Sequence, residues 1–357
     1  MKILILADYY EQYLFDFYEH NDLSDLNYED HLGVLLADYF GSFGSYYHYF
    51  KKIGHDVKLI IGNDYRLQTK WLRKRNINIT ACKKNKKKVV LMQIEEFNPD
   101  VFFISSMFDY YGEFLKVVSG ITRNIFAWIS CPYKTDLDFS NIKCIISSHS
   151  GFVDDFRKKG LNAEWLKVAF DSEIVHHLEN RKTKDVLFIG GLSKKTHKNR
   201  VCALEYLAGH GLDLELYGYG LQKSIWPFMK SPLQQYYRSE AWGLKMYRLL
   251  NESKISLNFH IDVAGNIAGN MRMFEATGCN SLLITEDYEF VDSLFKPGEE
   301  IITFRNHDDL FDKISYYLAH DQEREEITKR GHQACIERHG YDIRIKEFEK
   351  ILERHSL

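Results

Sequence analysis

Residues 255–285 read ISLNFHIDVAGNIAGNMRMFEATGCNSLLIT: an apolar segment, a Gly/Asn-rich loop, a helical segment and a second apolar segment in direct succession. Two near-continuous apolar runs joined by a helix are typical of parallel strands that are buried on both faces. A plain β-α-β core unit does not need so long a Gly/Asn-rich connection before its helix. The stretch therefore predicts a parallel sheet with a ligand site, of a kind that suits an anion, where the loop meets the helix.

The same kind of apolar run recurs along the chain in two series. The first comprises KILILA (2–7), DVKLII (56–61), VFFISS (101–106), IFAWIS (125–130) and CIISS (144–148), and the second comprises DVLFIG (185–190), LDLELYG (212–218), ISLNFH (255–260) and SLLIT (281–285). Helical-length segments separate the runs, so each series predicts a doubly wound α/β sheet. Ligands bind beyond the carboxyl ends of such strands, and we expect those ends to face each other across a cleft.

We therefore expect two Rossmann-like domains, at 1–170 and 185–340, because 357 residues are too many for one ordinary core. The polar and charged segment 171–184 is the predicted linker. A terminal helix at 341–357 follows a break at Gly340, and its apolar residues need a surface to cover. Those residues are Ile343, Ile345, Phe348 and Ile351.

Composition narrows the class of protein. Hydrophobic residues make up 45% of the chain and charged residues 27%, which is the balance of a soluble globular protein. The net charge of −3 does not favour nucleic-acid binding. The N-terminus does not read as a signal peptide, and no apolar run is long enough to span a membrane. Six scattered cysteines without a C-x-x-C pair indicate reduced thiols, so we expect a cytoplasmic protein.

The helix after the Gly/Asn-rich loop is expected to begin near Asn270. Its first backbone N–H groups and its dipole suit a phosphate, which Gly265 and Gly269 allow to approach and Arg272 can bind through two hydrogen bonds. Glu275, three residues further on the same face, is suited to accept hydrogen bonds from a ribose diol. The alternative is an ordinary surface ion pair between Arg272 and Glu275.

Three further groups are candidates for donor binding in the second half. His260 stands at the mouth of the loop and is either a ligand contact or a structural histidine. Small residues and cations follow the strand at 185–190, and a G-x-G follows the next strand, although its third fingerprint glycine is missing. These candidates are Gly190, Gly191, Lys198, Arg200, Tyr217 and Gly218.

In the first half, the candidates are again residues that follow strands. Asp109 and His149 are each a candidate general base for an acceptor hydroxyl. The alternatives are an N-cap role for Asp109 and a capping or core role for His149. Acceptor or cleft candidates are Asp8, Gly41, Ser42 and Gly44, the last three in a Gly-rich turn ahead of a helix at 46–53. The triplet DLD (136–138) is a chance match to a metal-binding D-x-D, so no metal site is expected.

The second half resembles the C-terminal domain of GT-B glycosyltransferases, and most closely the CgeB-like (spore-maturation-type) enzymes. The resemblance covers about 185–350 and rests on DVLFIGG (185–191), LYGYG (216–220), SKISLNFH (253–260), NMRMFEATGCNSLLITEDYEFVDSLFKPGEEIITFRN (270–306) and LFDKISYYLAHDQEREEITKRGHQACIERHGYDIRI (310–345). The first half is similar to the partner domain only in architecture and in GSFGSYYHYFKKIGHDV (41–57).

The resemblance implies that the C-terminal domain binds a nucleotide-diphosphate sugar and the N-terminal domain binds a glycan acceptor. It also implies that the terminal helix crosses back to the N-terminal domain, and that no metal is needed because Arg272, Lys198 and the amides near Asn270 offset the charge on the leaving diphosphate. In related retaining families two glutamates, with seven residues between them, contact the donor. Glu275 matches the second, whereas Ile267 stands in place of the first.

We therefore expect a glycosyltransferase of bacterial surface polysaccharide or lipopolysaccharide assembly, retaining rather than inverting. Its partners would be a nucleotide-sugar donor and a glycan or lipid-linked glycan acceptor, with no nucleic acid and no bound cofactor. The basic run KKNKKK (83–88) is either a solvated loop or a contact with the inner face of a membrane. The alternatives are a nucleotide-sugar epimerase of the same fold and a non-catalytic carbohydrate-binding or maturation protein.

Overall fold

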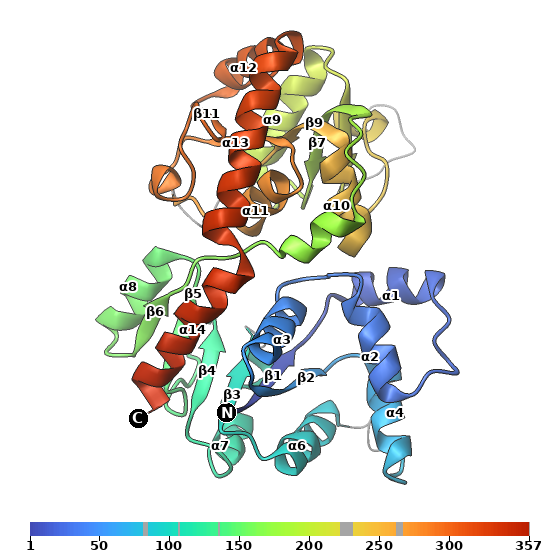
Figure 1. Cartoon of the computed structure of the whole chain (residues 1–357), viewed down its shortest axis with the longest axis vertical. Coiled ribbons are helices and arrows are strands. Elements are labelled where there is room, and N and C mark those ends of the chain that lie inside the picture. The colour runs from blue at the N-terminus through green and yellow to red at the C-terminus, as the bar shows by residue number, and fades with distance from the viewer. Residues whose placement is uncertain (81–84, 106–107, 135, 222–230, 262–266, 357) are drawn as a thin grey trace. The chain divides into compact units, whose positions relative to one another are not determined.

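The computed structural model describes residues 1–80, 85–105, 108–134, 136–221, 231–261 and 267–356. They form two compact units (Figure 1): unit 1 comprises Met1–Leu166 and Arg344–Leu357, and unit 2 comprises Lys167–Ile343. From the sequence, the first domain was expected to end at 170 and the terminal helix to begin at 341. The segment predicted as a linker, 171–184, lies in unit 2 and contains the 3-10 helix η2 (Ser172–His177).

Unit 1 is built on a six-stranded parallel sheet in the order β2-β1-β3-β4-β5-β6. The strands are β1 (Lys2–Ala7), β2 (Asp56–Ile61), β3 (Val101–Ile104), β4 (Ile125–Trp128), β5 (Cys144–Ser147) and β6 (Ala163–Trp165). The helices are α1 (Glu11–His20), α2 (Tyr28–Leu36), α3 (Phe43–Lys52), α4 (Tyr65–Lys74), α6 (Lys86–Phe97), α7 (Glu113–Val118) and α8 (Ser150–Lys158). The central strands read as unbroken apolar runs because helices cover both of their faces; residues 3–7 of β1 are wholly buried.

Unit 2 is built on a five-stranded parallel sheet in the order β11-β10-β9-β7-β8. The strands are β7 (Lys184–Ile189), β8 (Leu214–Tyr217), β9 (Ser253–Leu257), β10 (Leu282–Glu286) and β11 (Ile302–Phe304). The helices are α9 (Lys198–Gly209), α10 (Gly243–Glu252), α11 (Met271–Gly278), α12 (His307–Ala319) and α13 (Asp321–His339). Residues of α9 and α12 share the buried core with the sheet, among them Leu204 and Leu310. The predicted pair of doubly wound sheets is confirmed.

Three details of the expected elements are wrong. The two edge strands β6 and β11 were not predicted, because their sequences AEW and ITF are too short to form an apolar run. Helix α3 begins at Phe43 rather than at 46, so Gly44 lies in its first turn and not in a loop ahead of it.

The terminal helix α14 (Tyr341–Ser356) crosses back to unit 1, as the resemblance implies. Phe348 is completely buried and packs its ring against Tyr46 of α3 and Phe103 of β3, with ring centroids 5.5 and 4.8 Å apart. Ile345 and Ile351 are buried as expected, whereas Ile343 precedes the unit boundary and remains 36% exposed. Among the described residues, no helix is both long enough and apolar enough to cross a membrane.

Candidate functional site

The carboxyl ends of β7 and β9 are held together by Arg200, the third residue of α9. Its side chain is buried and donates one hydrogen bond to the carbonyl of Gly191 at 3.0 Å and another to the carbonyl of Phe259 at 2.9 Å. These contacts make Arg200 a positioning residue, because it fixes the two loops that border the predicted donor site. Lys198 lies exposed in the first turn of the same helix, where a cation is suited to an anionic ligand.

The glycines after β7 and β8 pack backbone against backbone. Gly190 donates its N–H to the carbonyl of Tyr217 at 3.0 Å, and Gly218 adopts a φ of +139° that favours glycine. A Cβ atom on Gly218 would lie 1.9 Å from the carbonyl oxygen of Gly190. The G-x-G is therefore needed for the close approach of two loops, which explains it without a ligand.

The hydroxyl of Tyr217 does not point to an open site, because it donates to Oε2 of Glu215 at 3.0 Å, and burial raises its pKa to about 12. The next residues offer an aromatic surface that the sequence analysis missed. Tyr219 is 45% exposed and stacks on Trp242 from the residue before α10, with ring centroids 6.2 Å apart and planes 14° apart. In the sequence, the single signal of this stack is the aromatic residue Tyr219, which directly follows Gly218 in LYGYG.

His260 follows β9 and is bonded on both sides of its ring. Nε2 accepts the backbone N–H of Gly269 at 3.2 Å, so the ring proton is on Nδ1, which donates to Oε2 of Glu286 at 2.8 Å. The backbone N–H of His260 donates to the same oxygen at 3.0 Å. The side chain is 3% exposed, and these bonds fit the structural-histidine interpretation. His260 thus fixes Gly269, whose φ of +129° favours glycine, immediately ahead of α11.

Asn270 is the N-cap residue of α11, but its side chain does not cap the helix. Its Nδ2 instead donates to Oδ1 of Asn258 at 2.9 Å and to the carbonyl of Phe259 at 3.3 Å. The first backbone N–H groups of α11 are therefore left without a side-chain acceptor from Asn270. An uncapped N-terminus at the carboxyl edge of a parallel sheet is suited to bind a phosphate.

Arg272 and Glu275 form an ion pair one turn into α11, with Nη1 2.8 Å from Oε2. The two residues form the pair that the alternative predicts, but the pair is largely buried and not on the surface, since the side chains are only 16% and 10% exposed. Nε and Nη1 of Arg272 have no hydrogen-bond partner among the described residues, since the contact with Glu275 lacks hydrogen-bond geometry. Buried donors without an acceptor are unfavourable, so Arg272 has hydrogen-bonding capacity for an anionic ligand.

In unit 1 the structure brings two predicted residues together around a lysine. Nζ of Lys86 lies 3.3 Å from Oδ2 of Asp8 and 3.9 Å from Oδ2 of Asp109, at the carboxyl edge of the sheet. Burial raises the pKa of Asp8, and the positive charge of Lys86 opposes this rise. Oδ1 of Asp8 and the hydroxyl of Tyr110 are buried without a hydrogen-bond partner among the described residues. This group of side chains is a candidate acceptor site.

The other candidates in unit 1 are placed less favourably. His149 is the N-cap of α8, where its Nδ1 accepts the N–H of Phe152 at 3.3 Å, so the capping interpretation applies. The N-cap interpretation of Asp109 is wrong, because Asp109 lies in the 3-10 helix η1 (Phe108–Tyr110) and its side chain is 79% exposed. Gly41, with a φ of +70°, and Ser42 lead into α3.

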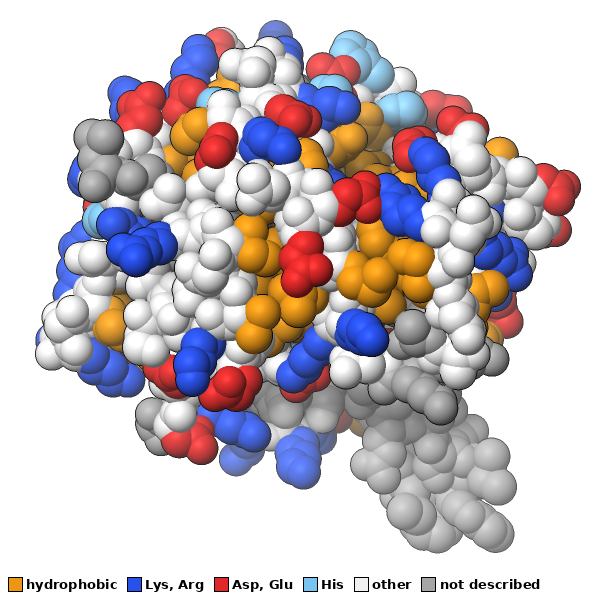
Figure 2. All heavy atoms as spheres, turned by 90° about the horizontal axis from the view of Figure 1, so that it is seen from below, with side chains coloured by type: hydrophobic (Ala, Val, Ile, Leu, Met, Phe, Trp, Pro, Cys, Tyr) orange, Lys and Arg blue, Asp and Glu red, His pale blue; other side chains and the backbone are white. Residues whose placement is uncertain are grey.

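The basic run 83–88 is only partly a solvated loop. Lys86 begins α6 and contacts Asp8, while Lys83 and Lys84 lie outside the described residues, as do Gly265 and Cys82. On the face drawn in Figure 2, basic side chains are interspersed with acidic ones, in keeping with the small net charge. That pattern gives no support to membrane contact on this face.

Comparisons with known proteins agree with this architecture. A family model described as glycosyl transferase-like matches residues 198–350. No curated protein sequence matches the chain.

Three solved structures are similar to the chain over 99% of its length. HepE of Anabaena, in complex with UDP-glucose, has a TM-score of 0.62, 11% identity and 100% of its own chain covered. A glycosyltransferase from Rickettsia africae has a TM-score of 0.61, 13% identity and 98% coverage. Sucrose-phosphate synthase of Thermosynechococcus elongatus has a TM-score of 0.59, 7% identity and 98% coverage. At such identities the likeness concerns the fold, and the fold of this chain is GT-B.

Proposed function

We propose that this chain is a glycosyltransferase that moves a sugar from a nucleotide-diphosphate donor to a glycan acceptor. The observation that carries the proposal is the start of α11. There an uncapped helix N-terminus and the unused hydrogen-bonding capacity of Arg272 lie together at the carboxyl edge of a parallel sheet. The family model that matches 198–350 and the UDP-glucose bound by HepE support the same class of donor.

Each part of the donor is matched by a group in unit 2. The diphosphate would lie against the first N–H groups of α11, with Arg272 and Lys198 supplying positive charge. Glu275 would accept hydrogen bonds from the ribose diol, which requires a ligand phosphate to replace it as the partner of Arg272. The exposed ring of Tyr219, backed by Trp242, is suited to stack on the base.

We propose that the transfer retains configuration and needs no metal. The bond between C1 of the sugar and the diphosphate oxygen breaks, and the acceptor oxygen bonds to C1 from the same face. The acceptor proton passes to the departing diphosphate oxygen, so no protein base is required. The helix N-terminus and Arg272 stabilise the negative charge that grows on the diphosphate.

In related retaining families the first of the two glutamates places a carboxylate near the sugar. In this chain Ile267 occupies the position of that glutamate. A β-bridge pairs Ile267 with Glu289, and Ala268 donates its N–H to the carbonyl of Glu289 at 3.0 Å. This pairing places the backbone of Glu289, which follows β10, beside Ile267 at the end of the Gly/Asn-rich loop. We propose that Glu289 takes over the contact with the donor sugar.

We further propose that unit 1 binds the acceptor at the group formed by Asp8, Lys86 and Asp109. The carboxylates accept hydrogen bonds from sugar hydroxyls, and the Tyr110 hydroxyl, which has no partner among the described residues, offers a donor. By its resemblance to CgeB-like enzymes, the acceptor is a growing bacterial surface glycan, free or lipid-linked. A contact with the inner face of the membrane would serve the lipid-linked case.

The test is a transfer assay with purified chain, UDP-glucose and other nucleotide sugars, in which release of nucleoside diphosphate and glycoside formation are both measured. Arg272→Ala and Glu275→Ala are each expected to lower kcat/KM by at least about tenfold, or about 1.4 kcal/mol of transition-state stabilisation. Arg123→Ala and Glu299→Ala remove an exposed arginine and an exposed glutamate and serve as controls. Full activity in both site variants would refute the donor assignment.

A further inference from the structure

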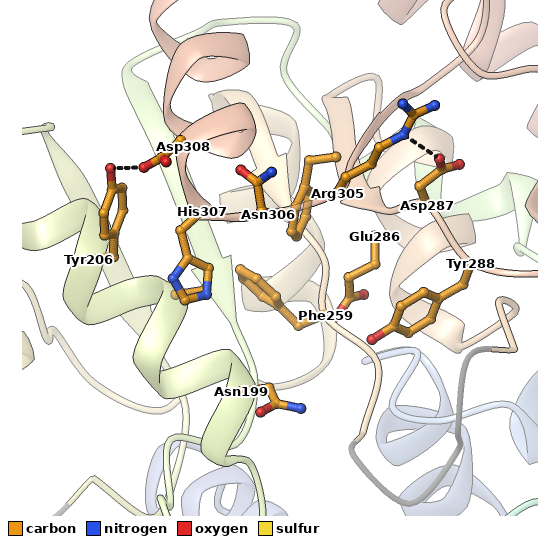
Figure 3. Close-up of a pocket in the computed structure, with 12 residues that line it drawn as sticks. Asn199, Tyr206, Phe259, Glu286, Asp287, Tyr288, Arg305, Asn306, His307 and Asp308 are labelled. Atoms are coloured by element: carbon orange, nitrogen blue, oxygen red, sulfur yellow. Dashed lines mark hydrogen bonds and ion pairs between the residues drawn. The ribbon is translucent and has the colours of Figure 1, made fainter.

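A cavity in unit 2 has a lining that includes neither Arg272 nor Glu275. It has a volume of about 650 Å³, within the range of small-molecule sites. Figure 3 shows its lining: Asn199 and Tyr206 come from α9, His307 and Asp308 from the start of α12, and Tyr288 from the opposite side. The cavity thus lies beyond the carboxyl ends of β10 and β11, where doubly wound sheets bind ligands.

The charge of the lining argues against a phosphate. Three carboxylates line the cavity, Glu286, Asp287 and Asp308, and Arg305 is the single Lys or Arg among the described lining residues. Nε of Arg305 lies 3.1 Å from Oδ2 of Asp287, so these two charges offset each other. Two negative charges remain, and they repel a nucleotide diphosphate. The lining therefore does not suit the diphosphate, and the cavity is a separate subsite that adjoins the proposed donor site through the bond between Glu286 and His260.

The remaining lining combines aromatic rings with hydrogen-bonding groups. Phe259 is 4% exposed and forms an apolar base, and the rings of Tyr206 and His307 lie 5.5 Å apart at one wall. Among the described residues, both hydrogen bonds of the Glu286 carboxylate use Oε2, which leaves Oε1 for a ligand hydroxyl. The exposed amide of Asn199 offers both a donor and an acceptor.

We propose that this cavity binds a neutral oligosaccharide. Sugar hydroxyls donate to carboxylates and accept from amides, while the C–H faces of sugar rings pack on aromatic side chains, and the lining offers all of these groups. Among the described residues, no group of three or more His, Cys, Asp or Glu side chains could hold a metal ion. Binding here is separate from transfer, so the proposal does not depend on the proposed function.

The test uses the full chain, saturation-transfer NMR and isothermal titration with maltotriose, cellotriose, chitotriose and laminaritriose at millimolar concentration. At least one of them is expected to bind. Tyr288→Ala and His307→Ala are each expected to weaken that binding by at least about tenfold in Kd. Tyr288→Phe keeps the ring and should retain binding. Tyr316→Ala removes an exposed tyrosine further along α12, outside the cavity lining, and is the matched control.

Three outcomes would overturn the proposal: no binding of any of these saccharides, binding that both alanine variants keep, or preferential binding of spermidine, which would indicate a cation site. Thermal unfolding of each variant without ligand shows whether the fold survives. UDP is titrated separately into the unmodified chain. Absence of UDP binding would count against the proposed function and leave the saccharide result intact.

Discussion

Replacing Arg272 and Glu275 singly and together separates their part in stability from their part in donor binding. Removing one partner of a buried ion pair costs about 3–5 kcal/mol, because the other charge is left without a partner. The side chains of Arg272 and Glu275 are still 16% and 10% exposed. We therefore expect Arg272→Met and Glu275→Leu each to cost about 3 kcal/mol, the lower end of that range. The double variant removes both charges and keeps apolar volume, so its stability should lie within about 1 kcal/mol of the unmodified chain.

Urea denaturation followed by tryptophan fluorescence measures these differences, and UDP-induced stabilisation measures donor binding in the same samples. The double variant should regain most of the stability that either single variant loses, while all three variants lose the UDP response. Single variants that each cost less than about 1 kcal/mol would indicate a pair that behaves as if exposed, and would refute the assignment of a buried pair. A double variant that responds to UDP like the unmodified chain would refute the donor role.

Three further predictions concern other parts of the molecule. His31 is buried, its Nδ1 has no hydrogen-bond partner among the described residues, and burial lowers its pKa to about 4. Because the unfolded chain binds this proton more readily, stability should fall as the pH drops from about 6.5 to about 4. His31→Gln should flatten that part of the curve of unfolding free energy against pH, and an unchanged slope would contradict the assignment. Gly218→Ala forces a Cβ to 1.9 Å from a backbone oxygen at a φ of +139° and should cost at least about 3 kcal/mol. Gly209→Ala, in the last turn of α9 with no atom within 4 Å of its Cβ, should instead stabilise by about 0.5–1 kcal/mol, and equal effects would refute the packing argument. Asp8→Asn should lower glycoside formation at least about tenfold while UDP binding stays intact. The exposed Asp138→Asn serves as its control, and a loss of UDP binding in Asp8→Asn would contradict the acceptor role.

Sequence patterns were sufficient for the fold wherever burial on both faces produces a long apolar run. All nine predicted strands are present, since each is a central strand or carries an apolar run at a sheet edge. The edge strands β6 and β11 were not predicted, because a three-residue strand with one neighbouring strand does not need a long apolar run.

The site was predictable in outline but not in its contacts. The spacing of Arg272 and Glu275 predicts that they meet, whereas their burial depends on how the rest of unit 2 packs around α11. The contact between Lys86 and Asp8 joins residues 78 positions apart, which no local pattern indicates. His260 illustrates a third limit, because only the fold shows that Glu286 and Gly269 occupy both nitrogens of its ring.

The account rests on nucleotide binding at α11, and a thermal-shift screen against UDP, GDP, dTDP, ADP and CMP tests it most directly. A ligand that binds only the folded chain stabilises it by about 2.7 kcal/mol at a hundred times its Kd. We predict a selective shift with one nucleoside diphosphate that disappears in Glu275→Ala and persists in Glu299→Ala. No shift with any of the five nucleotides at millimolar concentration would contradict the account.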